Sequence, residues 1–215
     1  MLKSKASIRD KFSQSFAIKY SLFESFTSFF RLKIINQQNL RLKNKKILDI
    51  CCGTGVNSLI LAKKGAIVVG VDLSKNQIRQ AKKRKKIDQS LKLKFQLMDA
   101  EGLAFKKNSF DIVFCSFGLH ELGTEKTFNK VISQIKRVLR PKGKLVIIDY
   151  NKPENKLLSS FFTRLILIFE PRETTKKVLD ISFLQFAKEY CLKPVKEKGY
   201  FLDLLKLWIF KNEKL

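Results

Sequence analysis

The chain has 215 residues, of which 45% are hydrophobic, so a packed globule of one domain is expected rather than a disordered segment. Its 44 Lys and Arg against 19 Asp and Glu give a net charge of +25. This charge indicates an acidic partner, nucleic acid or an anionic membrane surface, or a lysine-rich composition without functional meaning. No apolar run approaches the roughly 20 residues of a membrane-spanning helix, and the first residues lack a signal peptide. We therefore expect a cytoplasmic protein.

The four cysteines do not form a recognisable metal or disulfide pattern. Cys51, Cys52, Cys115 and Cys191 show no CxxC spacing, and the single histidine, His120, cannot complete a zinc set with them. We interpret them as reduced thiols of a cytoplasmic protein, and we predict no metal site.

The first 45 residues have the pattern of a helix. Between residues 10 and 35 aromatic side chains recur every three or four positions, which is the spacing of one helix face. These residues are Phe12, Phe16, Tyr20, Phe23, Phe26 and Phe30. The spacing predicts an N-terminal helical cap over residues 1–45.

From residue 46 onward, short β-rich runs alternate with windows of helical length and periodicity. This alternation predicts the α/β class, with a doubly wound, mostly parallel sheet and helices on both faces. The expected strands are 46–50, 66–72, 91–98, 110–116 and 144–150. The expected helices are 56–64, 75–87 and 124–139, the last stopped by a turn at residues 140–143.

The sequence changes character after the fifth expected strand. Residues 151–179 form an insertion with an apolar helix at 157–169, bounded by Pro153 and Pro171. A closing helix at 180–192 and two strands at 194–200 and 204–210 follow. We therefore expect a single domain, residues 1–215, with a core at 46–150, a lid insertion at 151–179 and a closing segment at 180–215.

A glycine-containing loop, residues 51–55, joins the first expected strand to a helix. Such a loop presents free backbone N–H groups at the carboxyl edge of the sheet, where open α/β sheets bind ligands. Gly53 and Gly55 let a ligand approach the backbone without an intervening Cβ. A dinucleotide loop has a third glycine, where this chain has Ser58, and no P-loop lysine follows. Phosphate binding is therefore disfavoured.

Acidic residues accompany this loop. Asp72 ends the second expected strand, where a carboxylate can accept both hydroxyls of a ribose, and Asp49 lies just before the loop. Two carboxylates and no basic residue in the loop suit a cationic nucleoside. S-adenosylmethionine, with its sulfonium and amino groups, is such a ligand.

The segment "ILDICCGTG" resembles the first motif of class I S-adenosylmethionine-dependent methyltransferases, in which the opening glycine is often replaced by cysteine, here Cys51. The resemblance implies a Rossmann-like, seven-stranded sheet. It also implies that Gly53 and Gly55 pass close to the methionine part of the cofactor, that Asp72 binds the ribose, and that Leu73 lies against the adenine.

Further motifs extend the resemblance over roughly residues 46–150. "LMDAEGLAF" is similar to the next motif, which implies that Asp99 contacts the adenine amino group and that Ala100 offers its backbone N–H. "NSFDIVFCSFGLHEL" and "RVLRPKGKLVIIDY" resemble the fourth- and fifth-strand motifs, which implies that Ser116 lies near the cofactor.

Nearly the whole chain resembles the ubiquinone/menaquinone biosynthesis C-methyltransferases. The similarity includes "CCGTG", "DAEGLAFKKNSFD" and "DYNKPENKLLSSFFTRLILIFEP". It implies C-methylation of a prenylated quinol-type or other lipophilic small molecule. The chain departs from that family where an Arg-Asn pair usually follows "FG", because His120 and Glu121 stand there, and where "FLDLL" replaces a Gly-Gly stretch.

His120 is the candidate catalytic base, because histidine titrates near neutral pH and can take a phenolic proton, and Glu121 is the candidate group that orients it. A capping or packing role for this histidine is the alternative.

The aromatic stripe and the 157–169 helix are expected to form a lid for a lipophilic substrate and to contact an anionic membrane, or else to pack only on their own domain. An RNA methyltransferase or a nucleic-acid-binding protein is the alternative function, although "CSFG" lacks the proline signatures of base-modifying enzymes.

Overall fold

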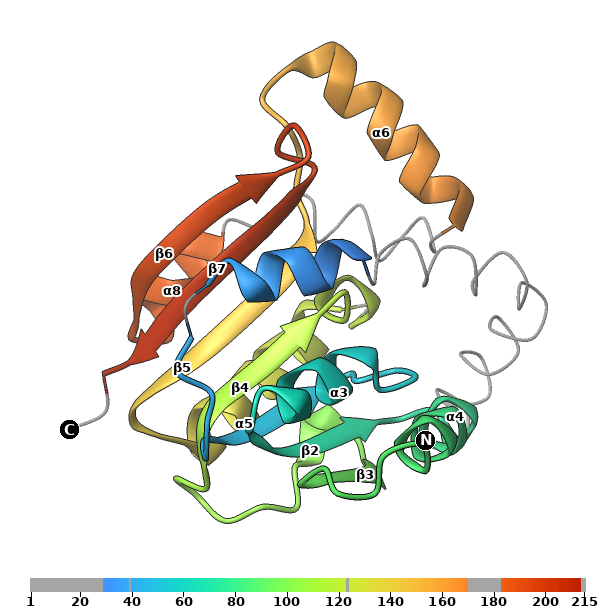
Figure 1. Ribbon diagram of the computed structural model, residues 1–215. Helices are drawn as coiled ribbons and strands as arrows, with labels where there is room; N and C mark the ends of the chain where they lie inside the picture. Colours follow the sequence, from blue (N-terminus) through green and yellow to red (C-terminus); the bar gives the residue numbers. More distant parts are fainter. Residues whose placement is uncertain (1–28, 39, 123, 170–182, 214–215) are drawn as a thin grey trace. The chain divides into compact units, whose positions relative to one another are not determined.

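The computed structural model describes residues 29–38, 40–122, 124–169 and 183–213, without the side chains of residues 121, 162, 165–169 and 183–185 (Figure 1). These residues fall into two compact units, the first ending at Ala100 and the second beginning at Glu101. Most of the predicted N-terminal aromatic stripe lies outside the described residues. Its last member, Phe30, lies in a helix formed by residues 29–36.

The first unit contains a parallel sheet with the strand order β3-β2-β1. Its strands are β1 (Lys46–Ile50), β2 (Ile67–Asp72) and β3 (Leu93–Leu97). The crossovers contain α3 (Val56–Lys63) and α4 (Lys75–Lys85). All five elements agree with the predicted positions to within two residues, because turn residues bound the apolar runs and the helical windows.

Strand pairing brings three loops to one edge of this sheet. Asp49 pairs with Gly70, and Asp72 pairs with Leu97. Because the strands are parallel, the residues that follow β1, β2 and β3 all lie at the carboxyl edge. The glycine loop and both predicted acidic positions, Asp72 and Asp99, are therefore at this edge.

The second unit contains a mixed sheet with the order β4-β5-β7-β6. β4 (Phe110–Ser116) and β5 (Leu139–Tyr150) are parallel, whereas β7 (Leu205–Asn212) is antiparallel to both β5 and β6 (Leu192–Tyr200). The helical elements are η1 (Ala100–Gly102), η2 (Leu119–Glu121), α5 (Glu125–Val138), α6 (Lys156–Phe169) and α8 (Phe183–Glu189).

The predicted turn at residues 140–143 is an irregularity inside β5. Helix α5 ends at Val138 and the strand begins at once, five residues earlier than expected. The pairing with β4 jumps from Leu139 to Lys144, and Lys142 has a positive φ of 62°. Residues 140–143 therefore bulge out of the β4–β5 pairing, and this local bend explains their turn-like composition.

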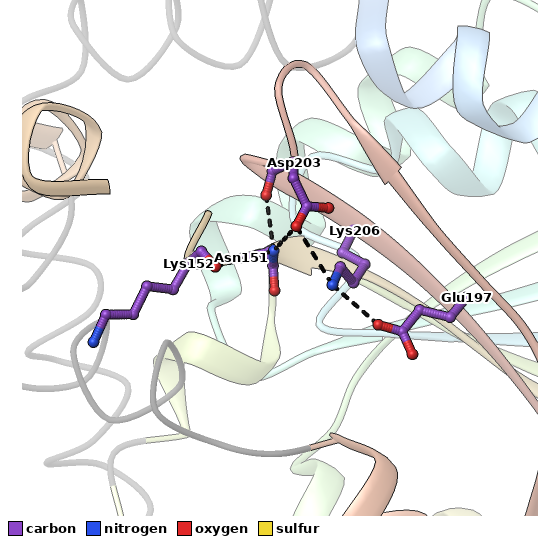
Figure 2. Close-up of polar contacts among 5 residues, drawn as sticks. All are labelled: Asn151, Lys152, Glu197, Asp203 and Lys206. Carbon is purple, nitrogen blue, oxygen red and sulfur yellow. Dashed lines mark hydrogen bonds and ion pairs between the residues drawn. The ribbon is translucent and has the colours of Figure 1, made fainter. Parts of the chain in front are cut away.

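The β6–β7 connection is tied to the segment that follows β5 (Figure 2). The side-chain amide of Asn151 donates to the carbonyl and to Oδ2 of Asp203, both at 2.8 Å. Lys206 Nζ lies 3.0 Å from Glu197 Oε1 and 3.5 Å from Asp203 Oδ2. These contacts hold the start of the 151–155 linker, and hence the N-terminus of α6, near the hairpin tip.

The predicted apolar helix after the fifth strand is present as α6. Within the described ranges, no helix has the length and apolarity needed to cross a membrane. The division into cap, core, lid insertion and closing segment stays a prediction.

Candidate functional site

The loop after β1 turns sharply through left-handed backbone conformations. Cys51, Gly53 and Gly55 have φ values of 51°, 54° and 82°. A Cβ on Gly55 would lie 2.8 Å from Cε1 of Phe95, so only glycine fits between the loop and β3. A Cβ on Gly53 would meet nothing within 4 Å. The backbone at Gly53 therefore has space beside it in which a ligand could approach.

Asp72 holds this loop against the end of β2. Its Oδ2 accepts the N–H of Gly53 at 2.8 Å, and its Oδ1 accepts the N–H of Ser74 at 2.9 Å. The carboxylate is buried, with 2% of the residue exposed. We expected both oxygens to receive ribose hydroxyls, but the structure already engages each of them with a backbone donor. A carboxylate oxygen can accept more than one hydrogen bond, and the ribose contact stays a prediction.

Asp49 is a fully buried acid beneath the loop. Ser58 Oγ donates to its Oδ2 at 2.5 Å, while Oδ1 has no hydrogen-bond partner among the described residues. Burial raises the pKa of the Asp49 carboxyl to about 7, even though the Ser58 hydrogen bond and the charge of Arg31 act to lower it. A positive charge bound close by would favour the ionised form and lower this pKa.

Ser58 is a site residue that the sequence analysis considered only as a missing glycine. Its hydroxyl is the hydrogen-bond donor to Asp49, and a Cβ on Gly70 would lie 2.8 Å from it. The signal available in the sequence was a small hydroxyl residue at the third glycine position of the loop, one helical turn into α3.

The other predicted residues of the first unit flank the same edge. The N–H of Met98 donates to the carbonyl of Asp72 at 3.0 Å, which holds the chain after β3 beside the end of β2. Asp99 follows directly and is half-buried, as is Leu73, whereas Ala100 is buried at the start of η1. Their predicted contacts with adenine stay predictions.

In the second unit, β4 ends at Ser116, which is 5% exposed. Its Oγ has no hydrogen-bond partner among the described residues. The next residue, Phe117, has a φ of 52° and donates its N–H to the carbonyl of Ile148 at 2.8 Å. This turn directs the chain into η2, which carries His120.

His120 is held by Asp149, the penultimate residue of β5. Its Nδ1 lies 2.8 Å from Asp149 Oδ1, and the two residues are 1% and 0% exposed. The Tyr150 ring lies against the imidazole, with centroids 5.0 Å apart. The histidine is therefore fixed in orientation, and it is buried rather than at the mouth of a pocket as we expected.

The hydrogen bonds of Asp149 assign the histidine tautomer. Asp149 Oδ2 accepts the N–H of Leu119 at 3.2 Å, and Oδ1 accepts the N–H of Tyr150 at 2.8 Å. Because both Asp149 oxygens act as acceptors, the ring nitrogen that faces Oδ1 is the donor, and the neutral imidazole carries its proton on Nδ1. Nε2 is then the basic nitrogen, which is the arrangement of a general base supported by an acid.

Asp149 was not predicted as a site residue, because the argument from sequence paired His120 with its neighbour Glu121. The available signal was a single acid within the apolar run of β5, "LVIIDY". The side chain of Glu121 lies outside the described residues, so its orienting role stays a prediction.

Comparison with known proteins identifies the family. Residues 48–147 match a family model described as a methyltransferase domain. The chain is 32% identical over 169 residues to the ubiquinone/menaquinone biosynthesis C-methyltransferase of Rickettsia bellii, covering 74% of this chain and 66% of that protein. It is 38% identical over 122 residues to a ubiquinone biosynthesis O-methyltransferase of Coxiella burnetii, covering 57% of this chain and 50% of that protein.

A solved structure of a SAM-dependent methyltransferase from Methanosarcina mazei is 22% identical and has a TM-score of 0.66, covering 83% of this chain and 96% of that one. This likeness confirms the predicted α/β fold with a mostly parallel, seven-stranded sheet. The present chain spans half to two thirds of the length of the curated relatives named above.

The fold, the loop and the matches define the class as methyltransferases. The chain belongs to the class I S-adenosylmethionine-dependent methyltransferase family. The prediction of S-adenosylmethionine as the cofactor is confirmed at the level of this family.

Proposed function

We propose that the protein transfers a methyl group from S-adenosylmethionine to a ring carbon of a lipophilic, quinol-type aromatic at a membrane surface. The observation that carries the acceptor chemistry is the buried His120–Asp149 pair, with Nδ1 and Oδ1 2.8 Å apart. The methyl donor is already activated by its sulfonium, but a phenolic acceptor must still lose its proton. A general base supplies this step.

The cofactor site in this proposal is the carboxyl edge of the first unit. The open space beside Gly53 admits the methionine part, and Asp49 provides the negative charge for its cationic groups. Asp72 contributes to the ribose contact and holds the loop in the shape that receives it. These three residues lie within residues 48–147, which match the methyltransferase family model.

The acceptor requires deprotonation because a phenol with a pKa of about 10 is mostly protonated at neutral pH. His120 Nε2 takes the phenolic proton, and the phenolate makes the neighbouring ring carbon nucleophilic. The methyl group would come from bound S-adenosylmethionine, whose sulfur would keep the electron pair of the broken carbon–sulfur bond. The ring then loses the hydrogen on the methylated carbon as a proton to solvent, and the oxygen regains the proton held by His120, so that the aromatic phenol is restored.

The proposal of a lipophilic acceptor is supported by two relatives whose names place them in quinone biosynthesis. The apolar α6 helix, which follows β5, is suited to cover a hydrocarbon tail and to exclude water, and this lid role is part of the proposal. The comparisons do not favour the alternative of an RNA methyltransferase or nucleic-acid-binding protein.

Transfer to a phenolic oxygen is a second candidate, because the Coxiella relative, 38% identical over 122 residues, is named an O-methyltransferase. The same base would serve that reaction, since the phenolate oxygen is also a nucleophile. The position of the new methyl group in the product separates the two reactions.

A transfer assay with labelled cofactor tests the proposal. The acceptors are demethylmenaquinol, its demethylated ubiquinone-pathway counterpart and bulk RNA, with the quinols dissolved in detergent. We expect label on a quinol ring carbon, identified by mass spectrometry of the fragments. Label on the oxygen would support the second candidate, whereas label on RNA alone would overturn both.

A further inference from the structure

The outward face of α6 combines large apolar side chains with cations. Leu157 and Phe161 are 85% and 63% exposed, and they lie four residues apart, on the same side of the helix. Ser159, between them in sequence, is only 7% exposed, so the opposite side is the covered one. The helix therefore presents apolar side chains to solvent and hides a serine, which reverses the usual arrangement of a surface helix.

The charges on this face all have one sign. Lys156 and Arg164 are exposed at either end of the Leu157–Phe161 pair, with exposed Ser160 between them. The α6 sequence, KLLSSFFTRLILIF, contains no acidic residue. A water-facing helix usually mixes both signs, whereas a helix lying on an anionic lipid surface has cations around its apolar residues.

The β6–β7 hairpin adds a third apolar side chain. Leu202, at its tip, is 72% exposed and has a φ of 55°, between Phe201 and Asp203, which also have positive φ values. This conformation is unfavourable for leucine, so the hairpin maintains the exposed position at some cost. The Asn151–Asp203 hydrogen bonds keep the tip close to the linker that leads into α6 (Figure 2).

We propose that Leu157, Phe161 and Leu202, with Lys156 and Arg164, form a membrane-docking face that inserts into the surface of an anionic lipid bilayer. The net charge of +25 favours an anionic partner. The exposed apolar side chains favour an anionic bilayer over a polyanion such as nucleic acid, because only a bilayer can bury them. This inference rests on the proposed function: a prenylated acceptor resides in the bilayer, so the enzyme must reach the bilayer surface to methylate it.

The binding should depend on both the apolar and the charged residues. Burial of an apolar side chain in the membrane interface strengthens binding by roughly tenfold or more per residue. Each cation near an anionic surface contributes roughly fivefold, and this part is screened by salt.

Cosedimentation of the full chain with vesicles tests the inference. The probes are vesicles of phosphatidylcholine alone and of an equal mixture of phosphatidylcholine and phosphatidylglycerol. We expect binding to the mixed vesicles that is at least several-fold tighter than to phosphatidylcholine alone. The double variant Leu157→Asp/Phe161→Asp should bind the mixed vesicles on the order of 100-fold more weakly.

Ile87→Asp is the matched control, because Ile87 is 88% exposed but lies in the first unit, away in sequence from the docking face. It introduces one of the same two negative charges at an equally exposed apolar position, and it should bind nearly as the unchanged protein does. Unchanged binding by the double variant, or an equal loss in Ile87→Asp, would overturn the docking face. Tighter binding to RNA that is lost in the double variant would also overturn it in favour of a nucleic-acid surface.

The outcome is independent of catalysis. Thermal unfolding and S-adenosylhomocysteine binding of the double variant should match those of the unchanged protein, which establishes that it is folded. Because Leu157 and Phe161 belong to the proposed lid, transfer is compared in Leu202→Asp, which lies outside α6. This variant should bind the mixed vesicles more weakly and should keep transfer to a detergent-dissolved quinol. Failure of vesicle binding with intact transfer overturns the docking face alone, and failure of transfer with intact vesicle binding overturns the proposed reaction alone.

Discussion

His120 and Asp149 are 29 residues apart in the chain, yet Nδ1 and Oδ1 lie 2.8 Å apart in the buried end of the β4–β5 pair. Two backbone N–H groups, of Leu119 and Tyr150, complete the hydrogen bonds of the carboxylate. The pair is therefore a preformed unit in which the acid sets both the orientation and the tautomer of the imidazole.

Replacement of Asp149 by Asn should lower kcat by on the order of 100-fold or more, because an amide can donate to Nδ1 and so place the imidazole proton on Nε2. The pH profile of the remaining activity should change, while S-adenosylhomocysteine affinity, measured by calorimetry, should not. Asp111→Asn, at the part-exposed Asp111–Arg140 pair of the same unit, is the control. Full turnover with an unchanged pH profile in Asp149→Asn or in His120→Gln would contradict the assignment of the base.

The two loop glycines should respond differently to alanine. In Gly53→Ala the new methyl group meets nothing within 4 Å, so the protein should fold with only the roughly 1–2 kcal/mol strain of a left-handed alanine. It should nevertheless lose S-adenosylhomocysteine affinity, because the methyl group occupies the space proposed for the ligand. Gly55→Ala should be the less stable variant, because its methyl group also overlaps the Phe95 ring. Thermal melts and calorimetry measure the two effects separately, and equal cofactor affinity in Gly53→Ala and the unchanged protein would argue against ligand approach at this position.

Asp72→Ala should weaken S-adenosylhomocysteine binding by tenfold or more, since it removes the acceptor for Gly53 and Ser74, each such charged hydrogen bond being worth roughly 1.5–3 kcal/mol. The loss combines any ribose contact with the loosened loop. Asp72→Asn separates the ribose contact from the loosened loop only in part. Its amide nitrogen cannot accept a hydrogen bond, so one of the two backbone N–H groups loses its acceptor. Asp88→Ala, in the turn after α4, is the control, and comparable calorimetric titrations of Asp72→Ala and the unchanged protein would refute the prediction.

The buried Asp49 should make the stability of the cofactor-free protein depend on pH. Its pKa of about 7 in the folded protein lies above the roughly 3.9 of an unfolded aspartate. The folded state therefore binds more protons between these values, and the free energy of unfolding should fall as pH rises from about 4 to about 7. In Asp49→Asn this loss should disappear. Urea unfolding of both proteins at about pH 5 and about pH 8 measures the difference, which should grow with pH; a constant difference would mean that Asp49 is ionised throughout.

Local sequence patterns were sufficient to predict most of the elements of both units. The five elements of the first unit were predicted to within two residues, because apolar runs and turn residues are local properties of the sequence. β5 was predicted five residues too short, since residues 140–143 have a turn composition although they form a bulge within the strand. That distinction depends on the partner strand β4, which a local pattern does not contain.

The glycine loop and its family could also be predicted from the sequence, because the type and spacing of residues 51–55 and Asp72 are themselves the motif. The partners of the charged groups were decided by the tertiary structure. Ser58 donates to Asp49, backbone N–H groups occupy the oxygens of Asp72, and Asp149 rather than a sequence neighbour supports His120. The physical reason is that a buried polar group must find a hydrogen-bond partner within about 3 Å, and strand register determines which residue of a distant segment is there.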